Sequence, residues 1–93
     1  MNTSDMIFKI RPVLRKYDVK KADIFGSVAS GEATNKSDVD LLVEMPKNST
    51  LLGFVRLKRD LEQKLLTSVD LVEYSSVNSK LAPFVFNKII PVL

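Results

Sequence analysis

The sequence predicts a small α/β (α+β) fold, with a mixed β-sheet of three to four strands flanked by helices. Short apolar runs, typical of strands, alternate with segments whose apolar residues recur at helical spacing. Their order is helix, strand, turn, strand, helix, strand and helix, as expected for a sheet covered by helices. With 93 residues, 45% of them hydrophobic and 27% charged, the chain is expected to form one domain over residues 1–93.

The helices are predicted from their apolar stripes. Thr3 or Ser4 would cap the first helix, whose stripe continues to Tyr17. Pro12 would either kink this helix or mark its true start. A second stripe covers residues 51–65, with basic and acidic residues between the apolar ones.

Three strands are predicted, over residues 21–25, 39–45 and 69–74. The run VDLLVEM at 39–45 is almost continuously apolar and ends before a proline, which is typical of a strand buried on both faces. Because consecutive strands commonly lie side by side, we expect 69–74 next to 39–45. A last short helix is expected over 81–89, with Pro83 in its first turn.

The composition excludes several kinds of chemistry. Without cysteine or histidine, the chain has no disulfide, no Cys/His zinc site, no thiol nucleophile and no imidazole base. Fourteen basic against eleven acidic residues give a net charge of +3, which is only mildly basic. No apolar run approaches the ~20 residues of a membrane span, and the first residues do not resemble a signal peptide. We therefore expect a cytoplasmic protein without a membrane partner.

The first candidate binding feature is Gly26-Ser27, directly after the predicted strand 21–25. A glycine there allows a sharp turn and a close approach of the backbone to a ligand. A helical turn starting at Ser27 would direct free N–H groups and a hydroxyl at one spot, an arrangement suited to phosphate. The alternative is an ordinary Gly-Ser turn within a loop over residues 27–37.

Three carboxylates form the second candidate feature. Asp38 and Asp40 are two residues apart at the head of a strand, so they project from the same face. Asp70, inside the next strand, can face the same pocket. A cation would relieve the repulsion between such charges, and oxygen ligands select Mg²⁺ or Mn²⁺. In the alternative interpretation, Asp38 caps a turn and Asp40 is simply solvated.

Together these features point to metal-assisted phosphoryl or nucleotidyl transfer, in which ions clamp the attacking and leaving oxygens. A carboxylate can take the proton from the attacking hydroxyl. Glu44 and Glu73, later in the same strands, are interpreted as surface or structural residues.

The spacing of these residues matches a known pattern. Gly26-Ser27, ten further residues and Asp38-Val39-Asp40 fit the GSx10DxD signature of the DNA polymerase β-like nucleotidyltransferase superfamily. The chain most resembles its short stand-alone members, the minimal nucleotidyltransferases. IFGSVASGEATNKSDVDLLVEM is similar to the family's strand, turn and strand, and VDLVEY to its third-carboxylate strand. The resemblance extends over nearly the whole chain.

The resemblance implies the polymerase β-like fold and a role for each matching residue. Gly26 and Ser27 would bind the β- and γ-phosphates of a nucleoside triphosphate, most simply ATP. Asp38 and Asp40 would hold Mg²⁺, and Asp70 would complete a second metal site and help to activate the acceptor hydroxyl. Members of this family serve as antitoxins beside helical HEPN-type toxins, and some transfer AMP to a toxin tyrosine.

One residue departs from the family pattern. Many relatives carry arginine in the segment GSxARG, where this chain has Ser30. Lys36, in the same loop, could supply a positive charge to the nucleotide. Ser30 keeps open a second hypothesis, that the chain is a weak or inactive binding module that neutralises a partner by complex formation.

Other partners are weighed from surface composition. Basic residues are scattered over the predicted helices and the aromatic residues fall at core spacing, so nucleic acid is not the expected partner. The apolar runs 6–8 and 91–93 could supply a modest interface for a homodimer or a hetero-oligomer.

Overall fold

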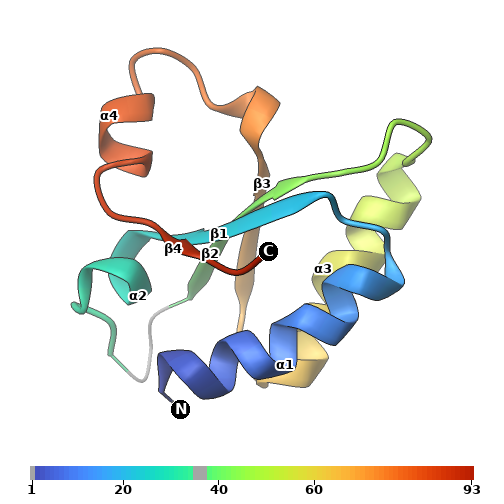
Figure 1. Cartoon of the computed structure of the whole chain (residues 1–93), viewed down its shortest axis with the longest axis horizontal. Helices are drawn as coiled ribbons and strands as arrows, with labels where there is room; N and C mark the ends of the chain where they lie inside the picture. The colour runs from blue at the N-terminus through green and yellow to red at the C-terminus, as the bar shows by residue number, and fades with distance from the viewer. Residues whose placement is uncertain (1, 35–37) are drawn as a thin grey trace.

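A mixed β-sheet crosses the molecule, and the computed structural model describes residues 2–34 and 38–93. The elements, in chain order, are α1 (Thr3–Lys16), β1 (Lys21–Phe25), α2 (Gly26–Ser30), β2 (Val39–Glu44), α3 (Leu51–Leu65), β3 (Val69–Glu73), the 3₁₀ turn η1 (Tyr74–Ser76), α4 (Ala82–Val85) and β4 (Ile90–Pro91). The predicted strands are confirmed, with the second and third one residue shorter than expected. The mixed sheet flanked by helices is confirmed as well (Figure 1).

The sheet has the strand order β3-β2-β1-β4. β1 is antiparallel to both β2 and β4. β2 and β3 pair in parallel, which confirms the prediction that they lie side by side. β4 was not predicted. It has two residues, one of them a proline, and it lies at the edge of the sheet, where a missing N–H is tolerated.

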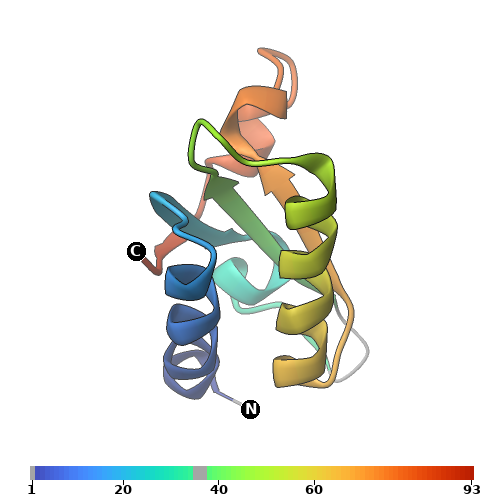
Figure 2. The same ribbon diagram turned by 90° about the vertical axis from the view of Figure 1, so that its right-hand side faces the viewer.

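The helices α1 and α3 lie side by side over one face of the sheet (Figure 2). Their inward residues and those of the strands form one core, in which the following side chains are fully buried: Ile10, Leu14, Ile24, Leu41, Val43, Leu57 and Leu61. The helical stripes of the sequence therefore mark the packed faces. Both helices therefore cover this face of the strands.

The start of α1 differs from the prediction. Asn2, not Thr3 or Ser4, caps the helix, and its side-chain oxygen accepts the Asp5 N–H at 2.8 Å. A cap residue with extended backbone comes just before the first helical residue, and Asn serves there as well as Ser or Thr. Pro12 lies inside α1 and does not mark its start.

The C-terminal segment, residues 77–93, also differs from the prediction. The expected helix over 81–89 is reduced to α4, which has four residues and ends at the cap residue Phe86. The chain then turns back to the sheet and pairs as β4 (Figure 1). Strand pairing with β1 has therefore replaced the last turns of the expected helix.

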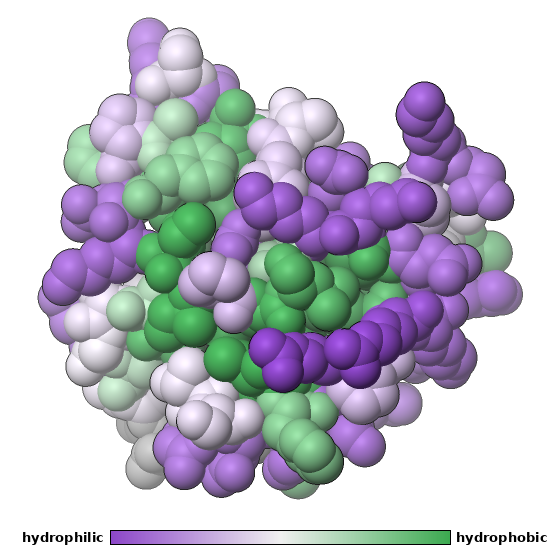
Figure 3. All heavy atoms as spheres, in the orientation of Figure 1, coloured by the Kyte–Doolittle hydropathy of each residue, from purple (hydrophilic) through white to green (hydrophobic). Residues whose placement is uncertain are grey.

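The proposed interface at the chain ends is only partly available. Met6 and Val92 are buried in the core, so they cannot contact a partner, whereas Phe8 is 80% exposed. Hydrophobic atoms nevertheless gather in the middle of the face shown in Figure 3, between elongated hydrophilic side chains. In the part of the chain that the structure describes, no helix is long and apolar enough to cross a membrane.

Candidate active site

The Gly-Ser turn directly follows β1. Phe25 is the extended cap residue of α2, and Gly26 adopts a φ of +70°, a left-handed value that side chains other than glycine's rarely allow. The short helix ends at Gly31, also left-handed, whose N–H donates to the Val28 carbonyl at 3.3 Å. The predicted helical turn is thus present and begins one residue earlier than expected.

Gly26 is also closely packed against the next strand. The β1–β2 register pairs Phe25 with Asp40, and a Cβ added at Gly26 would overlap Asp40 Oδ2 and lie 3.0 Å from its Cγ. A side chain at position 26 would therefore displace the carboxylate. This contact explains why position 26, where the Gly-Ser turn meets Asp40, is a glycine.

The three predicted carboxylates come from neighbouring positions. Asp40 and Asp70 are directly paired in the parallel β2–β3 register, and Asp38 immediately precedes β2. Asp38 and Asp70 are exposed, while Asp40 is half-buried. Burial raises the pKa of the Asp40 carboxyl, and the negative charges of Asp70 and Asp38 raise it further.

These carboxylates have the chemistry of a site for a hard divalent cation. Their ligand atoms are all oxygen, and a cation would offset both the desolvation and the repulsion that raise the Asp40 pKa. Within residues 2–34 and 38–93, no three acidic side chains converge closely enough to form a ready metal-binding group. The donor set therefore fits a magnesium or manganese ion in type, and the carboxylates would have to draw together around it.

Most of the predicted site residues meet at one end of the sheet. Gly26 and Ser27 lie where β1 ends, and the carboxylates lie where β2 and β3 begin. The strand directions bring these ends together, because β1 runs opposite to β2 and β3. The proposed nucleotide contact Lys36 lies outside the described residues.

A groove beside the Gly-Ser turn was not predicted from the sequence. The groove has a volume of about 310 Å³, and Phe84, Asn87 and Lys88 of the C-terminal segment form one wall of it. Gly26 and Ser27 are on the opposite wall. No local pattern marks the C-terminal residues, because their position depends on the pairing of β4 with β1.

The sequence also did not predict the contact between buried Asp23 and Tyr74. Asp23 of β1 is 2% exposed, and the Tyr74 hydroxyl donates a hydrogen bond to its Oδ2. Burial raises the pKa of the Tyr74 hydroxyl, and the bond to Asp23 raises it further. Asp23 interrupts the apolar run 22–25, which is the signal that could have identified it as a residue with a buried partner.

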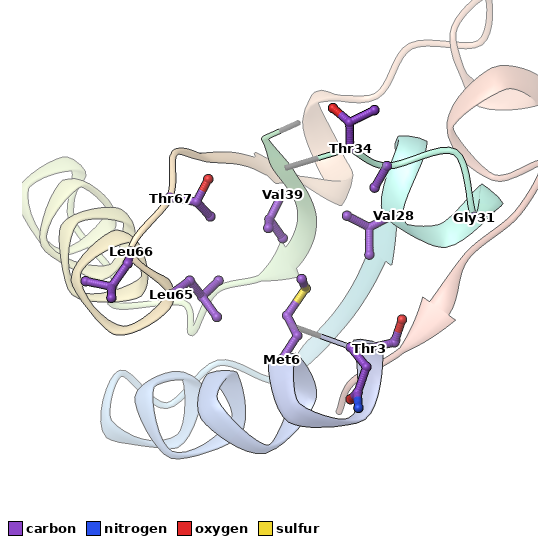
Figure 4. A pocket seen from close by; sticks show the side chains of 11 residues that line it. Thr3, Met6, Val28, Gly31, Thr34, Val39, Leu65, Leu66 and Thr67 are labelled. Carbon is purple, nitrogen blue, oxygen red and sulfur yellow. The ribbon is translucent and has the colours of Figure 1, made fainter. Parts of the chain in front are cut away.

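A second cavity, of about 480 Å³, lies between the start of α1, α2 and the end of α3 (Figure 4). Its walls are mainly apolar and include Met6, Val28, Val39 and Leu65. Of the predicted site residues that the structure describes, none lines it. The cavity is therefore separate from the cluster of the Gly-Ser turn and the carboxylates.

The fold and this cluster define a nucleotidyltransferase. The family model for polymerase β nucleotidyltransferases matches residues 8–92, and the chain belongs to that family. It is 42% identical, over the full length of both chains, to a Methanocaldococcus jannaschii protein provisionally named a protein adenylyltransferase.

Two solved structures are similar to the chain. One, provisionally described as a minimal nucleotidyltransferase, has a TM-score of 0.82 and 34% identity, over 98% of this chain and 96% of that one. The other is a toxin-antitoxin crystal structure with AMP-PNP, with a TM-score of 0.79 and 25% identity, over 94% of this chain and 72% of that one. The likeness to minimal nucleotidyltransferases drawn from the sequence is thereby confirmed.

Proposed function

We propose that the protein transfers AMP from ATP to a hydroxyl group of a partner protein and thereby acts as an antitoxin. The observation that carries the proposal is the meeting of the Gly26-Ser27 turn with Asp40 and Asp70 at one end of the sheet. A relative named for protein adenylyltransferase activity and a similar toxin-antitoxin structure with AMP-PNP support it. The candidate partner is a HEPN-type toxin with an acceptor tyrosine.

The turn would bind the triphosphate. Gly26 has no side chain to keep a phosphate away, and the Ser27 hydroxyl and nearby backbone N–H groups are donors suited to phosphate oxygens. The acceptor oxygen would attack the α-phosphorus, and the bond from that phosphorus to the bridging oxygen would break, releasing pyrophosphate. Asp70, an exposed carboxylate beside Asp40, would take the proton of the acceptor hydroxyl.

Asp38, Asp40 and Asp70 would hold Mg²⁺, or Mn²⁺ in its place. Bound divalent ions would neutralise charge on the triphosphate and on the departing pyrophosphate. The raised pKa of Asp40 supports this assignment, because it reflects a negative charge that the protein alone does not compensate. We further propose that one nucleotidyltransferase domain spans residues 1–93 and, since ATP is the donor, that the reaction takes place in the cytoplasm.

A binding module without activity is the second candidate. Ser30 favours it, because this chain carries a serine where many relatives carry arginine. The Ser30 hydroxyl donates to the Ser27 carbonyl at 3.2 Å, so it stabilises the turn and adds no charge to the phosphate site. Such a module would neutralise its partner by docking alone.

A labelling experiment separates the two candidates. The protein is incubated with α-³²P-ATP, Mg²⁺ and the HEPN-type protein from the same genome, alongside an Asp38→Ala/Asp40→Ala variant. Label on the partner that disappears with the variant supports the transferase. A stable complex that acquires no label with any of the four nucleotides would instead support the binding module.

A further inference from the structure

The C-terminal segment meets the Gly-Ser turn across the β1–β4 pair. In this antiparallel pair, Asp23 is opposite Pro91 and Ile24 is opposite Ile90. The pair ends at Ile24 and Ile90, so Gly26 follows it by two residues on one chain and Lys88 precedes it by two residues on the other. This places Lys88 near the turn that is expected to hold the triphosphate, and both residues line the same groove.

The side chains at this position enclose the groove beside the turn. Gly26, Ser27 and Ser30 line one wall, and Phe84 and Lys88 line the other. Figure 1 shows the same arrangement of elements, with α2 and the chain between α4 and β4 next to each other.

Lys88 is the only cation among the described residues that line the groove. Glu32 is the one acid there, and among the described residues Lys88 forms no ion pair with Glu32 or with any other carboxylate. Its charge is therefore available to a ligand. The wall formed by α2 carries no charge, since its lining residues are glycine and serine.

The segment that carries Lys88 is held at both ends. Before it, the Phe86 ring stacks on Tyr74 with centroids 6.4 Å apart, and the Tyr74 hydroxyl is bonded to buried Asp23. After it, β4 pairs with β1. Lys88 therefore extends from a positioned part of the backbone, so only its side chain has to be ordered when it binds a ligand.

We propose that Lys88 binds the phosphate tail of the nucleotide from the wall opposite Gly26 and Ser27. This inference rests on the proposed function, because it places the triphosphate at the Gly-Ser turn. The turn offers neutral donors, while a triphosphate carries several negative charges. A lysine ammonium supplies the missing point charge, as lysines do at many phosphate sites.

Equilibrium binding of AMP-PNP and of AMP to the full chain, with Mg²⁺, tests the proposal. Lys88→Ala should weaken AMP-PNP binding about three- to tenfold, as expected for loss of one solvent-accessible charge contact, and should change AMP binding less than twofold. Lys88→Arg should retain most of the affinity. Lys80→Ala, which removes an exposed lysine outside the groove from the same segment, is the matched control and should bind as the wild type does.

The outcomes distinguish this proposal from the one on which it depends. If the wild type binds AMP-PNP and Lys88→Ala binds it equally well, the role of Lys88 is refuted and the proposed function stands. If Lys88→Ala weakens AMP-PNP and AMP equally, the residue does not act on the phosphate tail, and the proposal is again refuted. If the wild type binds no AMP-PNP, both proposals fail together.

Discussion

The close contact between Gly26 and Asp40 makes the three glycines of the chain a graded test of the site geometry. Gly26→Ala would carry two costs, a left-handed φ of +70° and an overlap with the Asp40 carboxylate. Gly31→Ala shares the left-handed backbone, with a φ of +79°, but its Cβ would meet nothing within 4 Å. Gly53 lies inside α3, where alanine is favoured over glycine.

The expected free energies follow from these differences. A non-glycine residue in the left-handed region costs about 1–2 kcal/mol, which is all that Gly31→Ala should lose. Overpacking adds roughly 1–3 kcal/mol, so Gly26→Ala should lose about 2–5 kcal/mol. The overlap is chiefly with the Asp40 carboxylate, and the Asp40 Cβ also lies only 3.3 Å from the added carbon. Gly53→Ala should gain about 0.5–1 kcal/mol.

Urea unfolding of the three variants measures these values, and a double-mutant cycle isolates the contact. Asp40→Ala removes the atoms that a Cβ at position 26 would overlap, so it should recover about 1 kcal/mol or more of the loss from Gly26→Ala. A Gly26→Ala variant no less stable than Gly31→Ala, or a cycle without coupling between positions 26 and 40, would refute the reasoning. In the labelling assay Gly26→Ala should also lose transfer, because it displaces a carboxylate of the site.

Three further predictions concern ionisable groups. Because the pKa of Asp40 is raised in the folded protein, the free energy of unfolding falls as pH rises through that pKa. Asp40→Asn should therefore be more stable than the wild type at about pH 7, and this advantage should vanish on acidification. Urea unfolding at neutral and at acidic pH measures the difference, and a difference that does not change with pH would contradict the prediction. Tyr74→Phe leaves buried Asp23 without its hydroxyl donor and should cost about 1–3 kcal/mol in the same assay, whereas a neutral result would mean that the pair does not hold the C-terminal segment. The Tyr17 hydroxyl donates to Asp60 at 2.5 Å and lowers the pKa of that carboxyl, so stability from the ionised carboxylate is lost as pH falls through the lowered pKa. Asp60→Asn should therefore reduce stability near neutral pH and have little effect in acid, and a constant difference across the titration would argue against the bond.

The elements that could be predicted are those whose signal is local. The stripe over residues 51–65 predicts α3 with the observed bounds, because hydrophobic periodicity directly marks the packed face of a helix. The end of the chain was harder to predict. Residues 86–89 continue an apolar pattern that favours a helix, yet β4 pairs with β1, and tertiary pairing outweighs a short local preference.

The residues of the candidate site likewise differ in whether a local sequence signal marks them. Asp38 and Asp40 could be found because charges at the head of an apolar strand are unusual, and Asp70 because a second strand repeats the pattern. Asp23 and Tyr74 lie 51 residues apart, and Lys88 comes to the groove beside the turn only through the edge strand. No sequence window contains both partners of such contacts, so they emerge only when the sheet is assembled.

The directions of the strands leave the far end of the sheet clear of the site. β2 starts among the carboxylates and ends at Glu44, and the exposed residues Lys47 and Asn48 follow in the next turn. A strand of six residues spans about 20 Å, so a fluorophore there would be well separated from a bound nucleotide. Since the chain has no cysteine, Asn48→Cys would introduce a single thiol for labelling. The protein therefore offers a ready attachment point for observing partner and nucleotide binding in one molecule without obstructing either wall of the groove.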